Sequence, residues 1–285
     1  MSQFKEGADS ADYKKSWDAV SGVTEGAINA YILSLYKPDV SEEQAKALEH
    51  LETFWKQIGE SKVTSNYALG VPYALVFEKG LYKPDPLYSI LDEQFGGSSE
   101  FDQEAKNSQR VLNIGITNVN NGTFVSFNEK FKSKHLVDAL KASVAYPGIF
   151  EPHQAWDEEW FVGSSVWNID VTAPIMRCKA LGFAEKDIVM DVIVDSAVDL
   201  KTVDASKFNA FEMGWRTYTL MNYYKTFDGV IKAQKYFPDV QFRSMVGPKF
   251  SWVSLLENDL SRRLTQFVPI AYDQTQVKNQ IERGQ

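Results

Sequence analysis

The chain has 285 residues, of which 44% are hydrophobic and 24% are charged, and its formal net charge is -8 at pH 7. This composition excludes disorder as the main state, and the length allows a large buried core. An acidic balance without a concentrated basic face argues against nucleic acid as a partner. The single cysteine, Cys178, excludes an intramolecular disulfide and a cysteine-cluster zinc site.

The N-terminal residues 1–15 do not resemble a targeting signal. They carry Glu6, Asp9 and Asp12 and no apolar run, whereas a secretory signal needs an apolar stretch and a transit peptide is poor in acids. No segment of the sequence approaches the roughly 20 apolar residues of a membrane-spanning helix. We therefore expect a cytoplasmic protein, and association with an organelle or a large assembly stays open.

The first elements along the chain are a strand, a tight turn and a helix. Asp18–Ser21 is a short strand-like run that ends at Gly22, and residues 25–36 carry apolar side chains at helical spacing. Helices are expected next over residues 41–59 and 87–95. This order is typical of an α/β protein.

A β-hairpin is predicted in the middle of the chain. Residues 110–118 and 123–127 alternate between apolar and polar side chains, and the segment between them contains Asn121-Gly122. Asn-Gly between two such runs is the strongest short-range hairpin signal. Asn121-Gly122-Thr123 is also a glycosylation sequon, but we favour the turn because no signal peptide precedes it.

The remaining elements alternate and then become helical. We expect a helix at 134–144, a strand at 160–162, a helix at 171–181, a buried strand at 188–195, and helices at 205–236 and 251–267. The aromatic and methionine side chains of residues 213–224 are expected to face the core, and a ligand or lipid groove is the alternative that the spacing alone does not exclude.

No repeat or flexible linker interrupts the sequence. It therefore predicts a single domain over residues 1–285. Within it we expect a short extension at 1–16, an α/β core at 17–200 and a helix-rich part at 201–285.

One turn has the pattern of a nucleophile elbow. Gly22-Val23-Thr24-Glu25-Gly26 follows the predicted strand and opens the helix, as Gly-x-Ser-x-Gly does in hydrolases whose nucleophile stands on a sharp turn. Thr24 occupies the central position. The pattern alone is weak, because two glycines between a strand and a helix are also typical of close backbone packing.

Two further segments strengthen the pattern. Residues 22–30, 142–150 and 160–168 occur in the order and at the separation seen in patatin-like phospholipases, and the chain resembles that family over residues 17–197. The resemblance implies a three-layer α/β/α fold with a mainly parallel sheet. It also implies a lipid acyl hydrolase with a Ser-Asp dyad and a glycine-rich oxyanion loop, without a cofactor or metal.

The family's catalytic positions are altered in this sequence. The serine position carries Thr24, and the aspartate position carries Gly163, which is followed by Ser164 and Ser165. The family's first strand and glycine-rich loop should lie upstream of Trp17, where they are not recognisable. A threonine nucleophile still needs a base within hydrogen-bonding reach, and a glycine supplies none.

Other residues do not offer an obvious replacement base. Asp170 is expected to cap the helix that follows it, and His50, His135 and His153 lack acidic partners at motif spacing. Glu25 is expected to complement the helix dipole, although an inward carboxylate there would oppose an oxyanion.

The leading hypothesis is therefore a catalytically silent patatin homologue that acts as a structural or interaction subunit. We expect a protein partner near residues 17–22, where loss of the first strand would leave an exposed sheet edge. An active hydrolase that uses Thr24, or whose true N-terminus lies upstream, is one alternative. A non-catalytic module that binds lipid or a membrane surface is the other.

Overall fold

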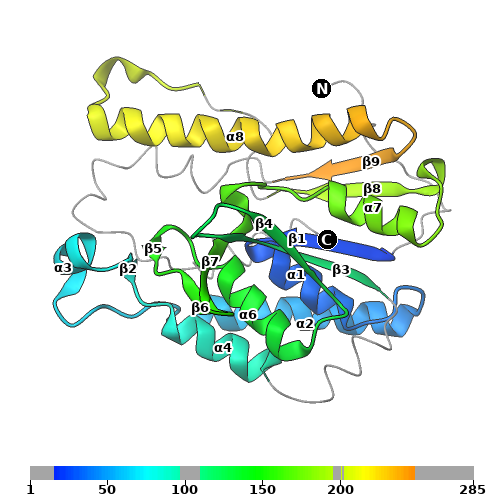
Figure 1. The fold of residues 1–285 in the computed structure, drawn as a ribbon, viewed down its shortest axis with the longest axis horizontal. Coiled ribbons are helices and arrows are strands. Elements are labelled where there is room, and N and C mark those ends of the chain that lie inside the picture. The colour runs from blue at the N-terminus through cyan, green and yellow to red at the C-terminus, as the bar shows by residue number, and fades with distance from the viewer. Residues whose placement is uncertain (1–15, 97–109, 195–199, 201, 248–285) are drawn as a thin grey trace. The chain divides into compact units, whose positions relative to one another are not determined.

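The computed structural model describes residues 16–96, 110–194, 200 and 202–247 (Figure 1). The chain divides into two compact units, whose described parts are residues 16–96 with 110–166, and residues 167–194, 200 and 202–247. We call them the elbow unit and the C-terminal unit. The single domain expected over 1–285 stays a prediction.

A five-stranded sheet forms the centre of the elbow unit. Its strands are β1 (Ala19–Val23), β3 (Val111–Asn118), β4 (Phe124–Asn128), β6 (His153–Ala155) and β7 (Glu158–Val162). β1 pairs with β3 in parallel, whereas β4 and β7 pair with β3, and β6 with β7, in antiparallel fashion. The α/β class is confirmed, but the expectation of a mainly parallel sheet is wrong for the described strands.

Two of the three antiparallel pairs, β3 with β4 and β6 with β7, follow from short connections. β3 and β4 are joined by the predicted Asn-Gly turn, and Gly122 has φ 74° there. β6 and β7 are joined by Trp156 and Asp157, both at positive φ, which fits a two-residue hairpin turn. Chains that reverse within a few residues can only pair antiparallel, since a parallel crossover needs a dozen residues or more.

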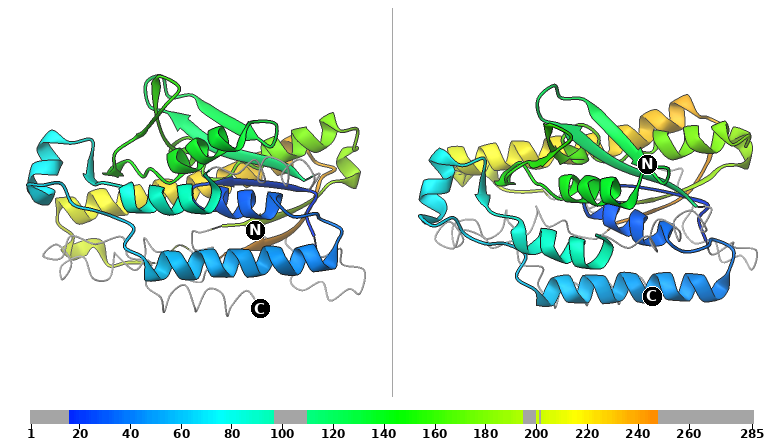
Figure 2. Two further views of the ribbon diagram at one scale, coloured as in Figure 1. Left: turned by 90° about the horizontal axis from the view of Figure 1, so that it is seen from below. Right: turned by 60° about the horizontal axis from the view of Figure 1, so that its bottom comes forward.

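Five helices accompany this sheet among the described residues of the elbow unit. They are α1 (Glu25–Ser34), α2 (Ser41–Glu60), α3 (Gly70–Phe77), α4 (Asp85–Phe95) and α6 (Ser133–Ser143). A small parallel pair, β2 (Gly80–Tyr82) with β5 (Gly148–Phe150), lies next to α3. α2 packs against α1, as the two views of Figure 2 show.

The core of the elbow unit lies between the sheet and these helices. Leu112, Ile114 and Ile116 alternate along β3 and are fully buried, so they form one apolar face of the strand. α1 and α6 cover this face, contributing Ile32 and Leu140 among others. Strand alternation and helical periodicity thus lead to the same core.

The C-terminal unit contains two helices and a two-stranded parallel sheet in its described part. Its elements are α7 (Thr172–Ala180), β8 (Val189–Ile193), α8 (Ala210–Tyr236) and β9 (Gln241–Val246). α8 begins at a capping box in which the Asn209 side chain and the Glu212 backbone N–H are bonded, with the reciprocal bond also present. This cap explains why the helix starts later than residue 205.

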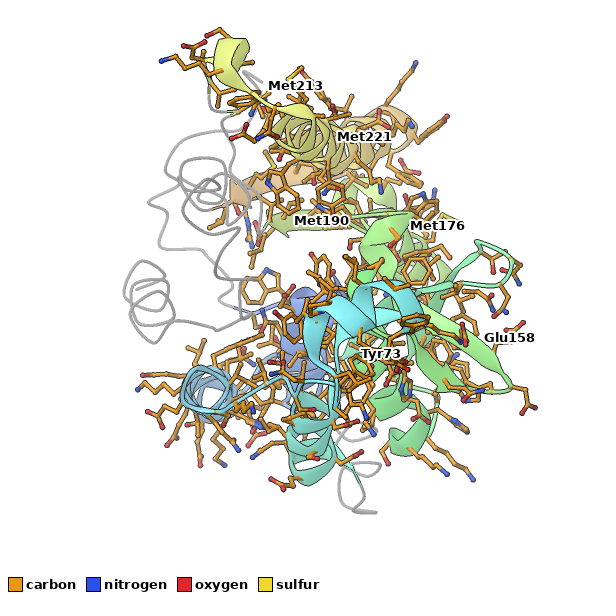
Figure 3. The ribbon with its side chains drawn as sticks, turned by 90° about the vertical axis from the view of Figure 1, so that its left-hand side faces the viewer. Tyr73, Glu158, Met176, Met190, Met213 and Met221 are labelled. Carbon is orange, nitrogen blue, oxygen red and sulfur yellow. The ribbon has the colours of Figure 1, made fainter. Side chains whose placement is uncertain are left out.

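Two burial expectations fail in this unit. β8 is not fully buried, because Val189 and Ile193 are exposed while Val192 is buried. On α8, Met213 and Met221 (labelled in Figure 3) are exposed rather than core-facing. The helix expected at 251–267 lies outside the described residues, and within the described ranges no helix is long and apolar enough to cross a membrane.

The packing of β3 predicts that truncating a buried leucine of the elbow unit destabilises the fold far more than truncating an exposed one. Leu112→Ala should lower the free energy of unfolding by about 2–5 kcal/mol, because the side chain is fully buried and its removal leaves a cavity. Leu48→Ala, at a leucine that is 65% exposed on α2, should change it by less than about 0.5 kcal/mol. Chemical denaturation of both variants measures this, and equal losses would contradict the assigned core.

Candidate functional site

Thr24 stands on a sharp turn between β1 and α1. β1 ends at Val23 and α1 begins at Glu25, so Thr24 alone connects the strand to the helix. Its backbone has φ 58° and ψ -131°, a conformation that is unusual for any residue with a Cβ and especially for a β-branched one. Strain of this kind costs on the order of 1–3 kcal/mol and is typical of functional turns. The turn therefore has the conformation that an elbow requires.

The two glycines around Thr24 have different roles. A Cβ added to Gly22 would lie 1.9 Å from the carbonyl oxygen of Gly26, whereas a Cβ added to Gly26 would meet no atom within 4 Å. Gly22 therefore lets the strand approach the first turn of α1, and Gly26 does not contribute to that approach through its small size. The backbone-packing interpretation of the glycine pair thus holds at Gly22.

β1 and β7 both pair with β3, and both end beside Gly115. Val23 pairs with Gly115 on one side, and Val162 pairs with Ile116 next to it. β4 pairs with β3 along this same stretch and so occupies the opposite edge. The chain following β1 and the chain following β7, Thr24 and Gly163, therefore meet at Gly115.

Gly163 has no space for a side chain in this backbone. A Cβ there would lie 2.4 Å from the carbonyl oxygen of Gly115 and 3.0 Å from Cε2 of Phe124. Val162 precedes a 3-10 turn that consists of Gly163, Ser164 and Ser165. The residue that we predicted at the aspartate position is thus closed to a side chain by the carbonyl of a neighbouring strand.

Ser143, at the end of α6, binds the elbow backbone. The Thr24 N–H donates to Ser143 Oγ at 2.7 Å, and that hydroxyl lies 3.4 Å from the Thr24 carbonyl oxygen and 3.5 Å from the Gly115 carbonyl oxygen. Ser143 is fully buried. It therefore fixes the strained turn to β3. Sequence reasoning gave Ser143 and Gly115 no role, although a glycine inside an alternating strand indicates close backbone approach.

The Thr24 hydroxyl makes no hydrogen bond within the described part of the elbow unit. The Thr24 residue is buried, with 4% of its surface exposed. A hydroxyl attacks efficiently only when a base accepts its proton. The geometry thus contains the elbow but, in residues 16–96 and 110–166, no base bonded to it.

The three histidines are engaged elsewhere. His50 Nδ1 lies 2.9 Å from Tyr36 Oη, and burial lowers the pKa of His50. His135 Nδ1 accepts from Trp156 Nε1 at 3.0 Å. His153 Nε2 lies 3.2 Å from Asp138 Oδ1, so His153 has an acidic partner, although not one at motif spacing. That pair joins β6 to α6, and the separation of fifteen residues conceals it in the sequence.

The remaining predicted residues have local roles. Glu25 is the first residue of α1, where a carboxylate complements the helix dipole. In the C-terminal unit, Asp170 Oδ1 accepts from the Ala173 N–H at 3.0 Å near the start of α7, as expected for a cap. Burial raises the pKa of Asp170. Over the described ranges, no group of three His, Cys, Asp or Glu side chains could hold a metal ion.

An α/β unit with a strained strand-turn-helix elbow defines a hydrolase-like scaffold, and a family model agrees. The model for patatin-like phospholipase matches residues 8–170. Because the match covers more than half of the chain, the chain belongs to the patatin-like phospholipase family. No curated protein matches the sequence. The match begins ahead of Trp17, and the loss of the family's first strand and glycine-rich loop stays a prediction.

The two glycines of the elbow provide a matched stability test. Gly22→Ala should lower the free energy of unfolding by about 1–3 kcal/mol, because its Cβ collides with a backbone carbonyl that cannot move freely. Gly26→Ala should be neutral or stabilising by up to about 1 kcal/mol, because alanine favours the helix and open space surrounds the site. Denaturant titration compares them, and equal effects would contradict the packing described for Gly22.

Proposed function

We propose that this chain is a catalytically silent member of its family that serves as a structural or interaction subunit of a larger assembly. The observation that carries the proposal is the position of the Gly115 carbonyl oxygen, which would lie 2.4 Å from a Cβ added to Gly163. The backbone around residue 163 occupies the space where a side chain would begin. This supports the view that the backbone, as well as the residue type, excludes an aspartate at this position.

The chemistry of acyl transfer indicates the size of the loss. Removing the groups that act on the nucleophile's proton lowers turnover by about 10⁴-fold or more in serine hydrolases. Thr24 keeps a hydroxyl, but its β-methyl group sits on a residue at positive φ, which restricts how the hydroxyl can be aimed. The absence of a bonded base in the described elbow unit supports the same conclusion.

An active acyl hydrolase that uses Thr24 is the second candidate. One observation favours it: the Thr24 backbone is strained and is held in place by Ser143. Backbone strain lowers the stability of the fold, so its presence is most easily explained by a functional role. Under our proposal the retained turn serves the packing of β1 on α1.

The proposed protein partner belongs to the same hypothesis. We place its contact near residues 17–22 on the sequence argument that the family's first strand is missing. Cross-links from this segment to a second chain in the native assembly would support this placement. Cross-links that form only at other surfaces would contradict it.

Hydrolysis assays distinguish the two candidates. We expect wild-type protein to release no fatty acid from phospholipid vesicles or short acyl esters above the buffer rate, and Thr24→Ala to be indistinguishable from it. The double variant Thr24→Ser with Gly163→Asp should also remain silent, because the aspartate cannot be accommodated without a backbone shift.

Thr24→Ser alone is the control for the hydroxyl, and circular dichroism of every variant controls for folding. Wild-type turnover that disappears in Thr24→Ala would establish the second candidate. Activity gained only in the double variant would contradict the steric argument at Gly163.

A further inference from the structure

The short helix α3 exposes an unusual amount of apolar surface. Residues 66–77, which contain the whole helix, include no Asp, Glu, Lys, Arg or His. Leu69, Leu75, Val76 and Phe77 are 67–70% exposed. Large exposed apolar patches on a folded unit mark sites of interaction.

The segment is held at its base rather than loosely attached. Ser65 and Lys83 form an antiparallel bridge in which each N–H donates to the other residue's carbonyl oxygen, at 3.0 and 2.9 Å. Ala74 is buried, and Tyr73, labelled in Figure 3, packs on Phe77 with the ring centroids 5.0 Å apart. The apolar side chains are therefore presented by an ordered projection with a closed neck, which we call the α3 tip (residues 66–77).

The distribution of side chains around α3 favours a lipid medium over a protein groove. Leu75, Val76 and Phe77 are consecutive, so they span about 200° of the helix circumference, and all three are exposed. A groove on a protein accepts one stripe of a helix, at positions i, i+3, i+4 and i+7. The hydrocarbon region of a membrane surrounds an inserted helix and therefore accepts apolar side chains on several of its faces.

Charges of both signs lie at the neck, because its lysines are accompanied by Glu78 and, from outside the segment, by Asp85, Glu151 and Glu159. Residues 61–83 contain Lys62, Lys79 and Lys83 and one acid, Glu78, in a chain whose formal net charge is -8. Lys79 pairs with Glu159 outside this segment, and the Lys83 ammonium lies 5.2 Å from the ring centroid of Tyr67. The neck therefore combines ammonium and carboxylate groups, and the apolar side chains of the tip supply the driving force for lipid binding.

We propose that the α3 tip inserts into the surface of a lipid membrane. Its apolar side chains enter the boundary between headgroups and acyl chains, and the neck lysines remain at headgroup level. This inference does not depend on the proposed catalytic silence, since the α3 tip would bind lipid whether or not Thr24 catalyses ester hydrolysis.

The full chain tests it in flotation with vesicles of phosphatidylcholine alone and with added phosphatidylserine. We expect the chain to float with both kinds of vesicle, because insertion of the apolar side chains does not require an anionic headgroup. Leu75→Glu with Val76→Glu should lower the partition coefficient at least about tenfold, because it removes apolar area and adds charge. Leu48→Glu is the matched control, since Leu48 is 65% exposed on α2, and it should bind within about twofold of wild type.

Failure of the wild-type chain to float with either vesicle would overturn the proposal. So would an equal loss in Leu48→Glu, or full binding by the double variant. If the wild-type chain ignores vesicles but self-associates, and the double variant is monomeric, the patch is a protein interface and the proposal is wrong. None of these outcomes depends on the hydrolysis assays.

A fluorophore at the tip reports insertion directly. In a Cys178→Ser background, Val76→Cys labelled with an environment-sensitive dye should shift its emission to shorter wavelength when vesicles are added. The same dye on Leu48→Cys should not shift. Equal responses at both positions, or no response at Val76→Cys, would contradict insertion of the α3 tip.

Discussion

The constraint on which the site depends is the carbonyl of Gly115, which occupies the space that a side chain on Gly163 would need. It follows from strand register: β1 and β7 share one edge of β3 and meet at Gly115, so both chain segments that leave them must pass this carbonyl. Phe124 from β4 closes the same position from another side. A side chain at residue 163 would have to displace parts of two strands at once, and close-packed interiors resist such shifts.

The elbow and the catalytic groups are separable features of this fold. The turn at Thr24 is supported by Gly22, which lets β1 approach α1, and by Ser143, which bonds to its backbone N–H. These supports act on the main chain and do not require a nucleophile or a base. A family member can therefore keep the conformation of the turn for packing while the side chains that perform chemistry change. Membership of the patatin-like phospholipase family accordingly defines the scaffold without defining the activity.

Much of the local structure could be predicted from the sequence, because local rules determined it. The Asn-Gly turn between β3 and β4 and the strand-turn-helix around Thr24 both follow from short-range patterns. The mixed sheet could not be predicted, because strand direction depends on which distant segments pair. The His153–Asp138 pair and the roles of Ser143 and Gly115 were missed for the same reason. The exposure of Met213 and Met221 on α8 was missed because helical spacing does not indicate which face of a helix is covered by other elements.

Labelling with a fluorophosphonate probe tests the central claim most directly, because the probe reports an activated hydroxyl without needing a suitable substrate. We predict that intact-mass analysis of the native protein shows no covalent adduct after prolonged incubation, since the Thr24 hydroxyl has no bonded base in the described elbow unit. A stoichiometric adduct that maps to Thr24 would contradict the account, because it would require a proton acceptor at the elbow.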